Sequence, residues 1–96
     1  MDRRGSPVPL FPLGQVVATH GAIALMAASR IEPVELLQRH QAGDWGDVDA
    51  EDWRENDYAV GRQLRIFSAY GQPPERLWVI TEADRSLTTI LRPDEY

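Results

Sequence analysis

The last third of the sequence constrains the fold most, because three β-type segments follow one another there with only short connections. Residues 64–70 alternate apolar side chains with polar or arginine side chains and end before Gly71. Residues 76–82 combine tryptophan with β-branched residues, and residues 87–91 also have the composition of a strand. Connections this short join antiparallel neighbours. The pattern therefore predicts a three-strand antiparallel meander.

The middle of the chain has the pattern of helices. Residues 22–30 are strongly helix-forming and almost wholly apolar, which predicts a buried helix. Pro33 is well placed as the first residue of a second helix, which ends at Gly43. Asp49 has the position of an N-cap before a third helix over residues 50–60. The inward-facing stripe of this third helix is predicted to be Ala50, Trp53, Asp57 and Val60.

The N-terminal residues divide into an arm and a strand. Residues 1–13 contain three prolines and are predicted to be extended or disordered. Residues 14–19 are a candidate for a short first strand. A chain of 96 residues leaves no room for a second independent core. We therefore predict a single α+β domain over residues 14–96, with two or three N-terminal helices packed on a three- to four-stranded antiparallel sheet.

Composition excludes several classes of protein. The chain has no cysteine, which rules out disulfides and thiolate zinc sites, and we expect no metal and no cofactor. It has no lysine, so a Schiff-base mechanism is excluded. The net charge of −5 disfavours binding to duplex DNA. Neither a membrane-spanning run nor a signal peptide is recognisable, so we expect a cytoplasmic location without a membrane partner.

An acidic stretch over residues 44–57 is the densest chemical feature, with seven carboxylates and one basic residue, Arg54. One interpretation is a solvated helix whose early acids complement the helix dipole. Another is a negative surface that binds an arginine-rich groove of a partner protein. A third is calcium coordination, although the spacing does not match an EF-hand loop. The protein-binding interpretation places contacts at Asp44, Trp45, Asp47, Asp49, Glu51 and Asp52.

Three basic side chains are further candidates for function. His40 lies near the C-terminus of the second predicted helix, where it either hydrogen-bonds a structural partner or acts as a general acid or base. Arg65 alternates with Ile66 and therefore points away from the face that Ile66 lines. It is either a cross-strand partner for a carboxylate such as Glu82 or a clamp for phosphate. Arg85, in the last turn, is a candidate binding residue.

Four segments occur in a characteristic order along the chain. They are FPLGQVVATHGA (residues 11–22), RHQAGDWGDVDAED (39–52), RIFSAY (65–70) and RLWVITEADRSLTTILRPDEY (76–96). In this order and spacing they resemble a small family of plasmid-related proteins carried by proteobacterial plasmids and integrative elements. The resemblance implies an accessory gene of mobile DNA, and it implies no mechanism.

A second, local resemblance covers the C-terminal half. Residues 65–70 followed by 77–90 are similar to the closing strands of barnase-type microbial ribonucleases, which implies a barnase/RelE-like architecture. The segment around Glu55 is similar to the one that carries the general-base glutamate of that family, although here it lies in a predicted helix. The resemblance implies that Glu55 is the base and Arg65 a phosphate clamp. The last turn lacks the family's acid histidine, so His40 is the candidate acid if the fold brings it to the same site.

Two hypotheses of function follow. The first is an accessory protein of a mobile genetic element that acts without catalysis, by binding a protein partner from host defence or from the transfer machinery. The alternative is a metal-independent ribonuclease or toxin-like protein that binds RNA and uses general acid–base chemistry. The sequence leaves the oligomeric state open.

Overall fold

The computed structural model describes residues 8–96, and residues 1–7, the start of the predicted arm, lie outside this range. The described chain forms three helices, four strands and a short 3-10 helix. In chain order these are β1 (Gln15–Ala18), α1 (His20–Ser29), α2 (Pro33–Gln41), α3 (Ala50–Ala59), β2 (Ile66–Tyr70), β3 (Leu77–Thr81), β4 (Leu87–Leu91) and η1 (Pro93–Glu95). This arrangement confirms the predicted α+β class.

The four strands form one sheet in the order β1-β4-β3-β2. The predicted meander is confirmed, because β2 pairs antiparallel with β3 and β3 with β4. The prediction of a wholly antiparallel sheet is wrong, since β1 runs parallel to β4, with Gln15 opposite Leu87 and Ala18 opposite Ile90. The three helices lie between β1 and the meander in sequence, and a connection this long permits a parallel pairing.

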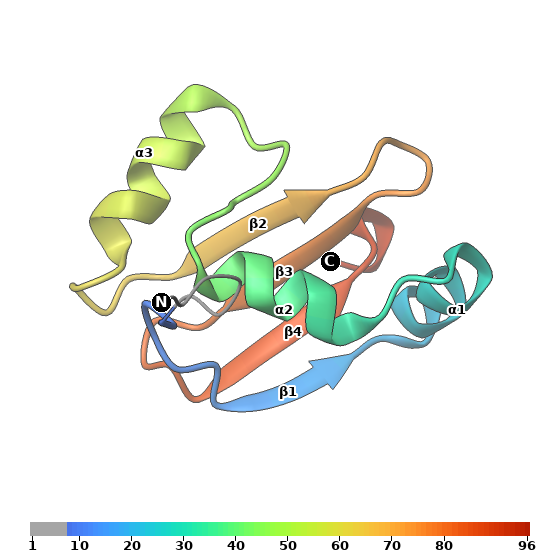
Figure 1. The fold of residues 1–96 in the computed structure, drawn as a ribbon, viewed down its shortest axis with the longest axis horizontal. Coiled ribbons are helices and arrows are strands. Elements are labelled where there is room, and N and C mark those ends of the chain that lie inside the picture. The colour runs from blue at the N-terminus through green and yellow to red at the C-terminus, as the bar shows by residue number, and fades with distance from the viewer. Residues whose placement is uncertain (1–7) are drawn as a thin grey trace, which may run out of the picture.

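One face of the sheet is covered by α2, which lies across β3 and β4, while α1 lies at the end of the sheet and α3 lies beside β2 (Figure 1). Pro33 is the first residue of α2, as predicted. The main core cluster joins Met26 of α1 and Leu36 of α2 to the sheet residues Tyr70, Val79 and Ile90. Burial of these apolar side chains holds the helices against the sheet.

Helix α1 is not the buried helix that its composition predicts. Only Ala22 and Met26 are buried, and the side chain of Ile23 is 53% exposed. The helix packs against the end of the sheet through one side, so the rest of its apolar surface faces outward. The Glu95 side chain, from η1, binds at the N-terminus of α1. It accepts hydrogen bonds from the Thr19 hydroxyl at 2.5 Å and from the Gly21 backbone N–H at 2.9 Å.

Helix α3 begins where the sequence predicts but presents a different face to the domain. The Asp49 side chain accepts from the Asp52 backbone N–H at 2.8 Å and caps the helix. Of the predicted inward stripe, Ala50 and Asp57 are exposed. The buried residues are instead Asn56 and Ala59. The other two members of the stripe, Trp53 and Val60, are partly buried and pack against the cluster that contains Ala59, so the stripe is half right. The hydrogen bonds of Asn56 to β2 turn this polar residue inward in place of Asp57.

The outer edge of β2 is closed by side-chain and loop contacts. Asn56 donates to the Phe67 carbonyl at 2.6 Å and accepts from the Phe67 N–H at 3.1 Å, as a neighbouring strand would. Ala69 donates to the Trp45 carbonyl and accepts from the Asp47 N–H. Gly46, at φ +78°, permits this approach, because a Cβ there would lie 2.0 Å from the Ala69 carbonyl oxygen. Because the outward-facing N–H and C=O groups of Phe67 and Ala69 are already bonded, they are not free to pair with a strand of another molecule.

The described part of the N-terminal arm has neither helix nor strand, and it packs against the domain. Phe11 is buried, and its carbonyl accepts from the Gln41 side chain at 2.8 Å. The Leu10 N–H donates to the Gln41 carbonyl at 2.8 Å. Phe11 joins Trp45 and Ile66 in a second core cluster beneath α3. Within residues 8–96, no helix is both long and apolar enough to cross a bilayer.

Candidate binding site on the open face of the sheet

Alternation along the strands divides the sheet into two unlike faces. Ile66, Ser68 and Tyr70 point to the face that α2 covers, and all three are buried. Phe67 and Trp78 point to the other face and are only partly buried. This other face is here called the open face. Ile80 and Leu91 also lie on it, but both are buried. Its partly exposed aromatic side chains make it the first candidate for a binding surface.

A row of aromatic rings crosses the open face. The Phe67 and Trp78 ring centroids are 5.0 Å apart with an interplanar angle of 85°. Trp78 and Tyr96 are 5.7 Å apart at 71°. Edge-to-face packing of this kind favours a fixed arrangement of the rings. The Arg65 guanidinium carbon lies 5.3 Å from the Tyr96 ring centroid, so this ring already accepts a cation.

The aromatic row forms one side of a hollow of about 280 Å³, here called the central hollow. Helix α3 supplies Asp52, Glu55 and Asn56 from adjacent turns, and β2 supplies Arg65 just before its first residue. The full lining is Asp52, Glu55, Asn56, Arg65, Phe67, Trp78, Ile80 and Tyr96. The structure therefore brings Glu55 and Arg65 to the same site, although no ion pair joins them.

His40 lies on the opposite side of the sheet from the central hollow. Its side chain has no exposed surface. Its Nδ1 lies 2.6 Å from the Ser68 hydroxyl and its Nε2 lies 2.9 Å from the Thr81 hydroxyl. A histidine with both ring nitrogens occupied and no solvent contact cannot exchange a proton with a substrate in this conformation. The structure therefore gives His40 the structural role that the sequence left open.

The hydrogen bonds of His40 fix its tautomer. The Thr88 hydroxyl donates to the Leu13 carbonyl, which can only accept. Thr88 has one hydroxyl hydrogen, so it must accept the hydrogen bond that it shares with Thr81 at 2.7 Å. Thr81 then has no hydrogen left for His40 and accepts from Nε2. Nδ1 accepts from Ser68, and His40 is the neutral Nε2–H tautomer.

Burial opposes a charge on this imidazole. Removal of the ring from water, together with the nearby positive charge of Arg85, lowers the pKa of His40 to about 3. A proton on Nδ1 would also require the Ser68 hydroxyl to turn from donor to acceptor. In the folded protein His40 is therefore neutral over the ordinary pH range, and protonation of its imidazole is coupled to unfolding.

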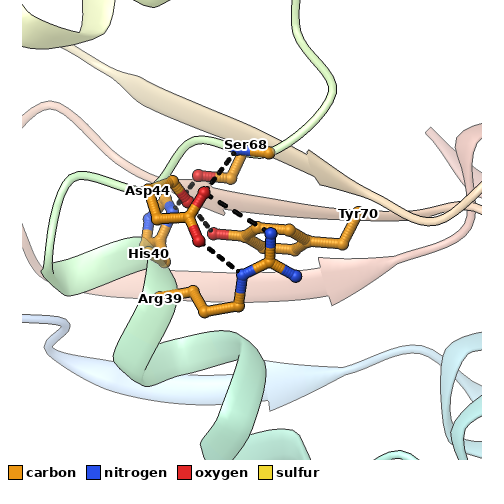
Figure 2. A network of polar contacts seen from close by, with 6 residues as sticks. Arg39, His40, Asp44, Ser68 and Tyr70 are labelled. Atoms are coloured by element: carbon orange, nitrogen blue, oxygen red, sulfur yellow. Dashed lines mark hydrogen bonds and ion pairs between the residues drawn. The ribbon is translucent and has the colours of Figure 1, made fainter. Parts of the chain in front are cut away.

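The predicted contact residue Asp44 has intramolecular partners. Figure 2 shows its carboxylate beside the Arg39 guanidinium, with the Arg39 Nε 2.7 Å from Oδ2. This hydrogen bond lowers the pKa of Asp44 and raises that of Arg39. Arg39 also lies over the ring of Tyr70, at 4.4 Å from the centroid, and the Tyr70 hydroxyl donates to the Asp44 carbonyl. Burial raises the pKa of Tyr70 to about 12.

Trp45, the aromatic residue of the predicted acidic surface, is a core residue. Its side chain has no exposed surface, and its ring stacks on Phe11 with centroids 6.2 Å apart. Its indole N–H donates to Asp57 at 2.9 Å. The prediction of Trp45 as a surface contact is therefore wrong. Flanking acids, as in Asp44-Trp45-Gly46-Asp47, do not reveal that the tryptophan turns inward.

The acidic stretch does not act as one surface. Three of its carboxylates have partners within the protein. Asp44 binds Arg39, Asp49 caps the N-terminus of α3, and Asp57 accepts from the Trp45 indole N–H. Asp47 and Glu51 are exposed. Of the predicted contacts, only Asp52 lies in the central hollow, together with Glu55. In the part of the chain that the structure describes, no three histidine or acidic side chains are grouped to hold a metal ion.

Arg85 is occupied by the protein's own backbone rather than presented for binding. One of its terminal nitrogens donates to the Leu64 carbonyl at 2.7 Å, and the other donates to the Ala59 carbonyl, the last of α3, at 2.9 Å. The first also lies 3.2 Å from the Glu82 carbonyl. A cation at these carbonyls neutralises the negative end of the helix. These bonds give Arg85 a structural role, and its binding role stays a prediction.

The candidate site residues named from the sequence leave out three aromatic members of the site, Phe67, Trp78 and Tyr96. Alternation places Phe67 on the same face as Arg65, and Trp78 belongs to a strand whose other face is wholly buried. Tyr96 could not have been found, because the turn of η1 brings it back over the sheet. Comparison with protein-family models, with curated proteins and with solved structures gave no match for this chain. The two family resemblances stay predictions.

Proposed function

We propose that this protein binds a protein partner through the open face of its sheet and that it does so without catalysis. The single observation that supports the proposal is the row of partly exposed rings at Phe67, Trp78 and Tyr96. Tryptophan and tyrosine are enriched at the energetic centres of protein interfaces, because they bury much surface with few rotatable bonds. The acidic stretch, which the sequence offered as the surface, contributes mainly Asp52 and Glu55.

The biological setting that we propose is that of an accessory protein of a mobile genetic element. It rests on the resemblance of four segments to plasmid-related proteins. A partner from host defence or from the transfer machinery fits such a setting. A small acidic domain with one aromatic surface is suited to occupying a surface on a larger protein.

Site-specific photo-crosslinking tests the proposal. Benzoylphenylalanine replaces Tyr96, which is 69% exposed in the candidate site, or Ile23, which is 53% exposed on α1. We expect position 96 to crosslink a single partner in a bacterial lysate at physiological salt and position 23 to crosslink none. Adding Trp78→Ser should reduce the yield at least tenfold. Equal yields from the two positions, or a yield that Trp78→Ser leaves unchanged, would contradict the proposal.

One observation favours the alternative, a metal-independent ribonuclease. Glu55 and Arg65, the base and clamp that the barnase-type resemblance implies, line the central hollow together. The lining holds no histidine, so Asp52 and the phenol of Tyr96 are the remaining candidate proton donors if Glu55 is the base. General acid–base steps typically contribute about 10²- to 10⁴-fold, so a site without its histidine should be slow at best.

Cleavage of a mixed-sequence RNA in EDTA decides between the two. If the protein is a ribonuclease, Arg65→Ala and Glu55→Gln should each lower the rate about 100-fold or more. Arg62→Ala is the matched control, because Arg62 is exposed and stacks on Tyr58 away from the central hollow. We expect no cleavage by the folded wild-type protein. Cleavage that survives both variants indicates a contaminating nuclease.

A further inference from the structure

Two more hollows extend the central hollow along the open face. One, of about 500 Å³, continues past α3 and shares Glu55 and Arg65 with the central hollow. The other, of about 380 Å³, has Trp78 in common with the central hollow and is also lined by Pro73, Pro74 and Pro93. The three hollows, each of which shares a lining residue with the next, are here together called the groove, and Trp78 lines both the central hollow and the one beside the prolines. An elongated groove fits an extended chain segment better than a compact ligand.

The two ends of the groove differ in charge. At the α3 end, Asp52, Glu55 and Glu51 line it with two arginines, Arg54 and Arg65. Three carboxylates against two guanidinium groups leave an excess of negative charge there, and Arg65 lies against the Tyr96 ring.

At the far end, Arg76 and Arg92 face a single acid, Asp94. Arg92 lies 3.5 Å from Asp94, whereas Arg76 uses its Nε to donate to the Gly71 carbonyl at 3.0 Å. A guanidinium has five N–H groups, so several donors of Arg76 remain for an incoming acceptor. The far end therefore has a surplus of positive charge.

We infer that the groove binds an extended segment of a partner protein that carries a basic side chain, an apolar anchor and an acidic side chain, in that spatial order. The basic group lies between Glu55 and the aromatic row, the anchor lies on Trp78, and the acidic group lies between Arg76 and Arg92. This inference rests on the proposed function and specifies the chemistry of the partner.

The aromatic row and the carboxylates together favour a cation at the α3 end. Trp78 stands nearly perpendicular to both Phe67 and Tyr96, so the rings form corners whose faces attract positive charge. A carboxylate beside such a ring adds a charge-assisted hydrogen bond. The contact of Arg65 with Tyr96 shows that a guanidinium fits against this ring. A phosphate would meet Asp52 and Glu55 at the same place, which disfavours a nucleic acid segment.

Titration of the protein with a designed peptide tests the inference. The probe is an acetylated, amidated heptapeptide with the sequence glycine-arginine-alanine-leucine-alanine-aspartate-glycine, and binding is followed by NMR at the Trp78 indole N–H. Matched control peptides replace arginine by citrulline, aspartate by asparagine, or leucine by serine. We expect each control to bind at least fivefold more weakly. We also expect the shifted resonances to lie in β2, β3, η1 and α3.

A variant of the protein identifies which group recognises the cation. Glu55 is exposed and its side chain bonds to none of the described residues, so Glu55→Gln should fold normally. This variant should weaken the arginine peptide at least fivefold and leave the citrulline peptide unchanged, since coupled groups do not contribute independently. Equal binding of the arginine and citrulline peptides, or no shift with any peptide, would overturn the inference. If position 96 still crosslinks a Trp78-dependent partner, the proposed function survives that result.

Discussion

Replacing Trp45 by alanine is expected to lower the free energy of unfolding by about 3–5 kcal/mol, the usual cost of truncating a buried aromatic residue. The side chain is fully buried, with Phe11 on one side and His40, at 5.9 Å between ring centroids, on another. Truncation also removes the donor to Asp57. Since domains of this kind are stable by about 5–15 kcal/mol, the variant should be close to unfolding.

Urea denaturation of the wild-type protein, Trp45→Ala and Trp78→Ala measures this difference. Trp78 is the matched control, because it is the same residue type on the open face and only partly buried. We expect its truncation to cost about 1–2 kcal/mol, since less surface leaves water on folding. The two tryptophans should therefore separate stability from binding. A stable Trp45→Ala variant that fails to bind its partner would restore Trp45 as a contact residue and contradict the structure.

The strands of the meander could be predicted because local sequence determines them. Residues 76–82 and 87–91 have strand composition on both sides of a tight turn, and β3 and β4 lie within these ranges. Asp49 and Pro33 could be placed for a similar reason, since a cap or an N1 proline acts within one turn of its helix. These features depend on neighbours in the chain.

The remaining features depend on residues that are distant in sequence. The parallel pairing of β1 with β4 joins positions that are separated by most of the chain. The orientation of α3 depends on Asn56, whose amide closes the edge of β2, and a polar residue on that face contradicts the rule that apolar residues face inward. Arg85 bonds to carbonyls from three separate segments. Local patterns do not report such contacts.

The candidate site could be predicted in part. Glu55 and Arg65 were chosen by resemblance and lie in the same hollow, whereas His40 was chosen as their partner and lies beneath the sheet. The difference follows from side-chain alternation. Arg65 leads into β2 on the open side, and Ser68, which binds His40, points to the covered side. A position on a helix does not specify which face of the sheet that helix will cover.

The stability of the protein should fall steeply as the pH decreases from about 6.5 toward 4.5, because of His40. In the unfolded chain an ordinary histidine binds a proton below about pH 6.5, whereas the folded state holds the pKa of His40 at about 3. Between these values the unfolded state binds more protons, so acidification favours unfolding by about 1.4 kcal/mol per pH unit. By about pH 4.5 the loss should be on the order of 2–3 kcal/mol.

Urea denaturation at a series of pH values tests this linkage, with His20→Gln as the control because His20 lies exposed at the start of α1. His40→Gln should be less stable than the wild type at neutral pH, since it disrupts the bonds to Ser68 and Thr81, but its stability should change little above about pH 4.5. The control should keep the wild-type dependence. A steep dependence that persists in His40→Gln would mean that other groups, such as the Arg39–Asp44 pair, carry the acid sensitivity. The change in the free energy of unfolding with pH, rather than its absolute value, therefore reports whether His40 is neutral in the folded protein. This neutral imidazole links Ser68 to the chain of hydroxyl groups that ends at the Leu13 carbonyl.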